Sequence, residues 1–172
     1  KPKKRKLKIN SGKGELHEFP HNTKIMERLE EIGLTRKPTN FVRTKITSSK
    51  DSYDVIKQFY HQDITLYESF FLLLLNNSNE TIGFVKISQG GITGTVVDVR
   101  IIAKYCVEVL ATSCILAHNH PSGKLRPSDA DLTITKKTKE ALAILDVRVL
   151  DHIILTEEGH YSFADDPENY IL

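Results

Sequence analysis

The sequence predicts an α/β (α+β) fold in which a mixed β-sheet is flanked by helices. The apolar run Phe70 to Leu75 is typical of a strand that is buried on both faces. Ser49, Asp98 and Ser128 each stand at the start of an amphipathic stretch, as residues that cap helices do. Strand-like and helix-like segments alternate along the chain, and this order favours a sheet covered by helices.

Each expected element has its own local signal. Asn76 to Asn79 supplies a turn between two strands, and Glu157 to Gly159 supplies the turn of a final hairpin. In the helix that follows Asp98, the residues expected to face the core are Ile101, Ile102, Tyr105, Val109 and Leu110. The expected helices cover 49–60, 98–112 and 128–145, and the expected strands cover 68–76, 81–88, 93–97, 114–120, 147–156 and 160–163.

The charge of the chain is unevenly distributed. Residues 1–13 hold seven Lys or Arg and no acid, whereas the rest holds 17 basic and 22 acidic residues. We expect residues 1–48 to be a basic tail followed by a short helix, begun by Asn22, and a linker. The compact domain is expected over 49–172. The tail is either a solvated, disordered segment or a contact for phosphates, such as those of DNA, or a nuclear address. The domain itself shows no basic stripe of the kind that nucleic-acid-binding domains use.

Composition favours a soluble protein of the cytoplasm. Hydrophobic residues make up 40% and charged residues 27% of the chain, and no apolar run reaches membrane-spanning length. The basic N-terminus lacks the apolar stretch of a secretory signal. The two cysteines, Cys106 and Cys114, do not form a CxxC motif, and we expect them to be reduced and buried. No membrane partner is therefore expected, and the oligomeric state stays open.

One segment matches a zinc pattern but stands in the wrong context. His17 to His21 fits H-E-x-x-H, a pattern that needs a continuous helix to place both histidines on one face. Pro20 lies inside that segment and would cost a helix roughly 3 kcal/mol. The flanking residues are polar and give such a helix no core face, so we do not expect a metal site here.

A second cluster has both the spacing and the context of a metal site. His118 and His120 lie at the end of an apolar strand, where side chains two residues apart point to the same side. Pro121 favours an extended backbone at His120. Asp131 lies in the first turn of the helix that Ser128 begins, so a strand end and a helix start can bring three ligands together.

This ligand set is typical of catalytic zinc, which keeps three protein ligands and one open position for water. Zinc lowers the pKa of its bound water to roughly 7, and the Ser128 hydroxyl could donate to a developing oxyanion. Three alternatives stay open. Ser128 and Asp131 have the spacing of a helix capping box. Two histidines and one carboxylate also bind iron in oxygenases. A structural zinc site would need a fourth ligand, and Cys114 precedes His118 on the same strand by an even spacing.

Hydrolysis by such a site also needs a general base. Periodicity alone leaves Glu68 and Glu108 as candidates. Glu68 opens the most apolar strand of the chain, where a carboxylate is unexpected unless it is paired, functional or at a solvated strand end.

The run His118 to Asp131 resembles the metal motif of the JAMM, or MPN+, metalloproteases, and its details resemble the RadC family within that group. The resemblance covers roughly residues 49–172. It implies the mixed sheet and cytidine-deaminase-like architecture of the group, zinc held by His118, His120 and Asp131, Glu68 as the general base, and Ser128 as the residue that steadies the tetrahedral intermediate. It also implies that His152 lies near the site. Further matching segments are Glu68-Ser69-Phe70, Asp98-Val99-Arg100, Asp151-His152-Ile153-Ile154 and Tyr161-Ser162-Phe163.

The expected function is therefore that of a zinc-dependent metallopeptidase-like hydrolase, which cleaves peptide or isopeptide bonds with a Glu-activated, zinc-bound water. The substrate peptide or protein is not specified by the sequence. The alternative is a nucleic-acid-binding module associated with DNA repair or mobile elements, with DNA contacted through residues 1–13. One departure weakens this alternative, because members of the family usually carry a helix-hairpin-helix domain and residues 1–48 are too short for it.

Overall fold

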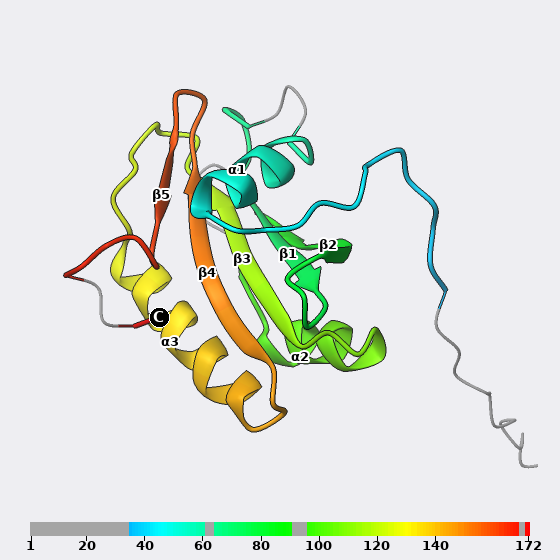
Figure 1. Cartoon of the computed structure of the whole chain (residues 1–172). Helices are drawn as coiled ribbons and strands as arrows, with labels where there is room; N and C mark the ends of the chain where they lie inside the picture. The colour runs from blue at the N-terminus through cyan, green and yellow to red at the C-terminus, as the bar shows by residue number, and fades with distance from the viewer. Residues whose placement is uncertain (1–34, 61–63, 91–95, 169–170) are drawn as a thin grey trace, which may run out of the picture. The chain divides into compact units, whose positions relative to one another are not determined.

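The computed structural model describes residues 35–60, 64–90, 96–168 and 171–172, which form a three-layer fold around one five-stranded sheet (Figure 1). The strand order is β2-β1-β3-β4-β5; β3 and β4 are parallel, and every other neighbouring pair is antiparallel. This confirms the predicted mixed sheet. The strands are β1 (Ser69–Leu75), β2 (Thr81–Gln89), β3 (Ser113–Asn119), β4 (Arg148–Leu155) and β5 (His160–Ser162); the helices are α1 (Ser49–Lys57), α2 (Val99–Glu108) and α3 (Asp129–Ala143).

The chain divides into two compact units, residues 1–35 and residues 36–172. The described fold belongs to the second unit. The basic tail 1–13, the helix expected after Asn22 and the segment His17 to His21 lie outside the described residues.

Two apolar clusters cover opposite faces of the sheet. One joins α1 to β1 and β4 through residues such as Ile56, Phe71 and Ile153, which are all buried. The other joins α2 and α3 to the opposite face, through residues such as Ile102 and Leu142. Every residue of β1 is buried, which is why this strand is a continuous apolar run rather than an alternating one. A fully buried leucine contributes roughly 1.5–3 kcal/mol, so β1 and β3 form the stable centre of the sheet.

The helix starts follow from local side-chain chemistry. Ser128 caps α3, and its hydroxyl accepts from the backbone N–H of Asp131 while the Asp131 side chain accepts from the Ser128 backbone. Asp98 caps α2 as predicted. In α1 the cap is Ser48, one residue before the predicted Ser49, because Ser48 is the residue that forms a capping box with Asp51.

The predicted inner face of α2 was partly wrong. The helix ends at Glu108, and Leu110 adopts a left-handed conformation with φ of 56°. This turn leaves Leu110 83% exposed, and Ile101 is 41% exposed. The buried line of the helix is instead Val99, Ile102 and Cys106. Residues 96–97 of the strand expected over 93–97 are not in a strand, and the rest of it lies outside the described residues.

Two further expectations concern the state of the cysteines and the presence of a membrane-spanning helix. Cys106 and Cys114 are buried and free, as predicted. Among the described residues, no helix combines the length and the apolar character that crossing a membrane requires.

Candidate metal centre

Three potential ligands meet where the end of β3 faces the start of α3. His118 Nε2 lies 2.9 Å from His120 Nε2 and 3.1 Å from Asp131 Oδ1, and His120 Nε2 lies 3.5 Å from Asp131 Oδ2. Ligands held at about 2.0–2.1 Å from one ion stand about 3.0 Å apart at right angles and about 3.4 Å apart in a tetrahedron. The observed spacing therefore fits a single metal ion, and these three residues could hold one.

The hydrogen bond of its Nδ1 atom determines the tautomer of His120. Its Nδ1 lies 2.7 Å from the backbone carbonyl oxygen of Lys124. A carbonyl oxygen only accepts, so Nδ1 carries the hydrogen of the neutral ring and Nε2 presents a lone pair to the site.

A buried chain of hydrogen bonds determines the tautomer of His118 in the same way. The Thr135 hydroxyl donates to the Asp131 backbone carbonyl at 2.5 Å, so it accepts from His152 Nδ1 at 2.6 Å. His152 Nε2 then has no hydrogen and accepts from His118 Nδ1 at 2.8 Å. His118 Nε2 is left as an acceptor. When both rings are neutral, two imidazole lone pairs and one carboxylate thus converge, which is the arrangement that a cation completes.

Asp131 is oriented by the cap of its own helix. Its Oδ2 accepts from the backbone N–H and the hydroxyl of Ser128, both at 2.7 Å, which leaves Oδ1 facing His118. Burial acts to raise the pKa of Asp131, but hydrogen bonds with His118, His120 and Ser128 outweigh it and hold the pKa far below its usual range. The carboxylate is therefore ionised and available as a ligand at any ordinary pH.

The pKa values of two further residues at this site, His120 and His152, are also shifted. A proton on His120 Nε2 would be stabilised by a hydrogen bond to Asp131, and this raises the pKa of His120 against the effect of burial. Burial lowers the pKa of His152 well below the usual value. His152 is thus held neutral, as its role as acceptor for His118 requires.

Glu68 directly precedes β1, and His120 directly follows β3. The antiparallel register pairs Phe70 with His118, so these two residues lie at the same end of the paired strands. Glu68 is half-buried, and it lines a cavity of about 270 Å³ together with His120 and Ser128. The structure thus brings the expected base and the expected ligands together. Glu108, the other acid considered, ends α2 and pairs with Lys104.

Ser128 is more tightly engaged than the sequence suggested. Its hydroxyl hydrogen is donated to Asp131 Oδ2, and its oxygen accepts from the Asp131 backbone. In this geometry Ser128 positions a ligand. Donation to an oxyanion, the role expected from the sequence, would require the hydroxyl to rotate away from Asp131, and that role stays a prediction.

Asn119 is the residue that sequence reasoning missed. It is fully buried, and its amide nitrogen donates to the carbonyl oxygens of Ile64 at 2.6 Å and Tyr67 at 2.8 Å. Its amide oxygen accepts from the backbone N–H of Ser69 at 2.8 Å. One side chain therefore ties down the segment that carries Glu68. Strand alternation turns Asn119 away from the two histidines, and its partners lie fifty or more positions away.

The cysteines do not extend the ligand set. Cys114 packs with Cys106 in the apolar cluster under α2, and neither belongs to the group formed by His118, His120 and Asp131. A fourth protein ligand of the kind that closes structural zinc sites is thus not supplied by a cysteine.

Comparison with known proteins gives the same family as the motif. A family model described as RadC-like JAB domain matches residues 46–169. A UPF0758 protein of Flavobacterium johnsoniae is 47% identical over 137 residues, which are 79% of this chain and 59% of that protein. A UPF0758 protein of Vibrio cholerae is 44% identical over 143 residues, or 82% of this chain and 86% of that protein. The chain spans 59% and 54% of the length of its relatives in Flavobacterium johnsoniae and Porphyromonas gingivalis.

Proposed function

Because the chain belongs to the family of RadC-like JAB domains, we propose that it is a zinc-dependent hydrolase of peptide or isopeptide bonds. The observation that carries the proposal is the meeting of His118 Nε2, His120 Nε2 and an Asp131 oxygen, which offer three lone pairs to one ion when both rings are neutral. Zinc held by these residues would act as a Lewis acid, polarising a carbonyl oxygen and making water more acidic, with a pKa of roughly 7.

Side chains of the protein would carry out the proton transfers and position the reacting groups. A Glu68 carboxylate oxygen accepts a proton from the attacking water, whose oxygen bonds to the carbonyl carbon of the substrate. The carbon–nitrogen bond breaks, and Glu68 returns the proton to the leaving nitrogen. His152 and the Lys124 carbonyl keep the two ligand imidazoles in the required tautomer, and Asn119 holds the segment that carries Glu68.

The experiment that tests this function is hydrolysis of a mixed panel of peptides and lysine-linked isopeptides by the zinc-loaded protein. We expect cleavage that stops when a chelator removes the metal and returns when zinc is restored. Mass spectrometry of the products identifies the bond. Cleavage that persists in the chelated protein, or zinc-loaded protein that cleaves no member of the panel, would contradict the proposal.

A contact with DNA through residues 1–13 is a second proposal, supported by the seven basic residues of that segment. Deleting these residues should remove a DNA affinity that falls steeply with salt, measured by fluorescence anisotropy. An affinity that the deletion leaves unchanged would contradict it.

A further inference from the structure

Two basic side chains stand between the candidate metal centre and a larger groove. The cavity that contains Glu68 and His120 is also lined by Lys124 and Arg126. A groove of about 1470 Å³ runs alongside α3 and shares Arg126 and Ser128 with this cavity. The two hollows therefore adjoin at Arg126 and Ser128, so a chain bound at the metal centre lies next to the groove.

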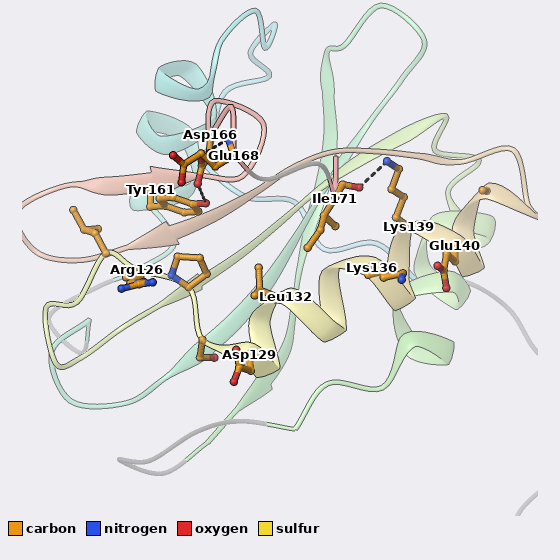
Figure 2. A pocket seen from close by; sticks show the side chains of 14 residues that line it. Arg126, Asp129, Leu132, Lys136, Lys139, Glu140, Tyr161, Asp166, Glu168 and Ile171 are labelled. Carbon is orange, nitrogen blue, oxygen red and sulfur yellow. Dashed lines mark hydrogen bonds between the residues drawn. The ribbon is translucent and has the colours of Figure 1, made fainter.

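The groove has the size and the walls of a site for a polymer. Figure 2 shows Leu132 of α3 on one side and Tyr161 of β5 on the other, with Lys136 and Lys139 further along α3. Pockets for small molecules usually measure about 300–1000 Å³, so this groove is too large for one such ligand. Its far end is formed by the chain itself, where Lys139 donates to the carbonyl oxygen of Ile171 at 2.6 Å.

The charges along the groove favour a polypeptide over a nucleic acid. Four carboxylates line it alongside three basic residues, and the Tyr161 hydroxyl lowers the pKa of one of them, Asp166, by donating to it at 2.6 Å. A phosphate backbone would meet repulsion along this wall, since it needs a continuous basic surface. An extended polypeptide, with apolar and both kinds of charged side chain, fits the mixture. The four carboxylates are Asp129, Glu140, Asp166 and Glu168.

Lys124 and Arg126 are the two basic residues that line the cavity beside the metal centre. Within the described part of the chain, neither side chain forms an ion pair, and both are exposed at the cavity. Lys124 is held beside the metal centre because its carbonyl accepts from His120. A guanidinium presents paired donors that match a carboxylate. We propose that the substrate is an extended polypeptide that lies along α3 and places an acidic side chain, next to its scissile bond, against Arg126 and Lys124. This inference rests on the proposed function.

The test measures binding, so it does not depend on turnover. The probes are two fluorescein-labelled ten-residue peptides of Ala and Ser around a central Leu-Glu pair or its Leu-Gln twin. They are titrated by anisotropy into the zinc-loaded full chain carrying Glu68→Gln. We expect the Glu peptide to bind about two- to fivefold more tightly, as an ion pair gives at an exposed site. Arg126→Glu should abolish this preference.

The matched control is Arg148→Glu. Arg148 is also exposed, but it pairs with Ser113 at the opposite end of the parallel strands from His120. This variant should keep the preference for the Glu peptide, because its changed charge lies away from the site. The basic tail is present in every protein compared, so it contributes equally to each measurement. A preference that survives Arg126→Glu, or the failure of both peptides to bind, would overturn the proposal. So would a single-stranded DNA oligonucleotide that binds in place of the peptides and is released by Arg126→Glu. Peptides that bind the Glu68→Gln protein but are not hydrolysed by the zinc-loaded parent would instead count against the proposed function alone.

Discussion

The two halves of the candidate site are built in different ways. On the ligand half, the imidazoles of His118 and His120 and the carboxylate of Asp131 each have a partner that fixes their orientation, and these partners come from β4, α3 and the loop after β3. On the base half, Glu68 follows a segment in which Leu66 is 57% exposed and Tyr67 is 44% exposed.

The base half is held by the amide of Asn119, by the Tyr60 hydroxyl, which donates to the Ser69 carbonyl oxygen at 2.8 Å, and by the Gly90 N–H, which donates to the Glu68 carbonyl oxygen at 2.9 Å. In the ligand half each side chain that would bind the metal has a partner of its own, whereas the hydrogen bonds of the base half hold the backbone around Glu68. We therefore expect mutations to separate metal binding from turnover, because the two halves share β3 but not their supporting hydrogen bonds.

The largest expected effect separates the halves at the reacting group itself. Glu68→Gln keeps the size of the side chain but removes the group that accepts a proton, so turnover should fall by roughly 10²–10⁴-fold. Zinc content should stay at the parent value, since Glu68 is not among the three ligands. Steady-state hydrolysis and metal analysis on the same sample check both points. Turnover equal to that of the parent would show that Glu68 is not the base.

The next effect weakens the ligand half alone. His152→Phe removes the acceptor for His118 Nδ1, and such a loss behind a ligand imidazole lowers metal affinity by roughly 10–100-fold. Competition with a chelating dye measures the affinity. Thr135→Val, which removes the next hydrogen bond of the chain, serves as a milder comparison and should give a smaller loss. If His152→Phe binds zinc as tightly as the parent, the buried chain does not orient His118.

The smallest effect concerns the support of the base half. Asn119→Ala removes three hydrogen bonds, to Ile64, to Tyr67 and to the first residue of β1, and we expect kcat to fall about tenfold with KM and zinc content little changed. Unfolding should also become easier by roughly 1–3 kcal/mol, because buried backbone groups lose their partners.

A matched control distinguishes positioning from lost stability in that variant. Ser162→Ala removes buried hydrogen bonds to Asp151 and to the backbone of Asp165, away from Glu68. It should cost comparable stability while kcat stays at the parent value. Equal kcat in the Asn119 and Ser162 variants would mean that Asn119 has a structural role only.

The sequence predicted the ligand half better than the base half, for a physical reason. The spacing of His118 and His120 on a strand, and of Ser128 and Asp131 at a helix start, is local, so periodicity and capping place these residues without tertiary information. Asn119 stood in the motif between the two histidines, but its partners lie far away in the sequence. No local rule names them, although a buried amide must find partners somewhere.

The fold also contains features that local patterns predict and features that depend on distant parts of the chain. Strands and caps followed from local patterns, including the buried run of β1. The inner face of α2 did not, because where the helix ends depends on the left-handed turn at Leu110 and on how the chain returns to β3. The hydrogen bond between His118 and His152 joins β3 to its parallel neighbour β4, a pairing that sequence alone leaves open.

The central claim is that His118, His120 and Asp131 hold one metal ion. The most direct measurement is the metal content of the purified protein, by elemental analysis, for the parent and for the double variant His118→Ala/His120→Ala. We expect one zinc per chain in the parent and none in the folded double variant. A folded parent that binds no metal even after zinc is supplied would contradict it, as would a double variant that keeps its zinc; iron in place of zinc would contradict the proposed hydrolysis.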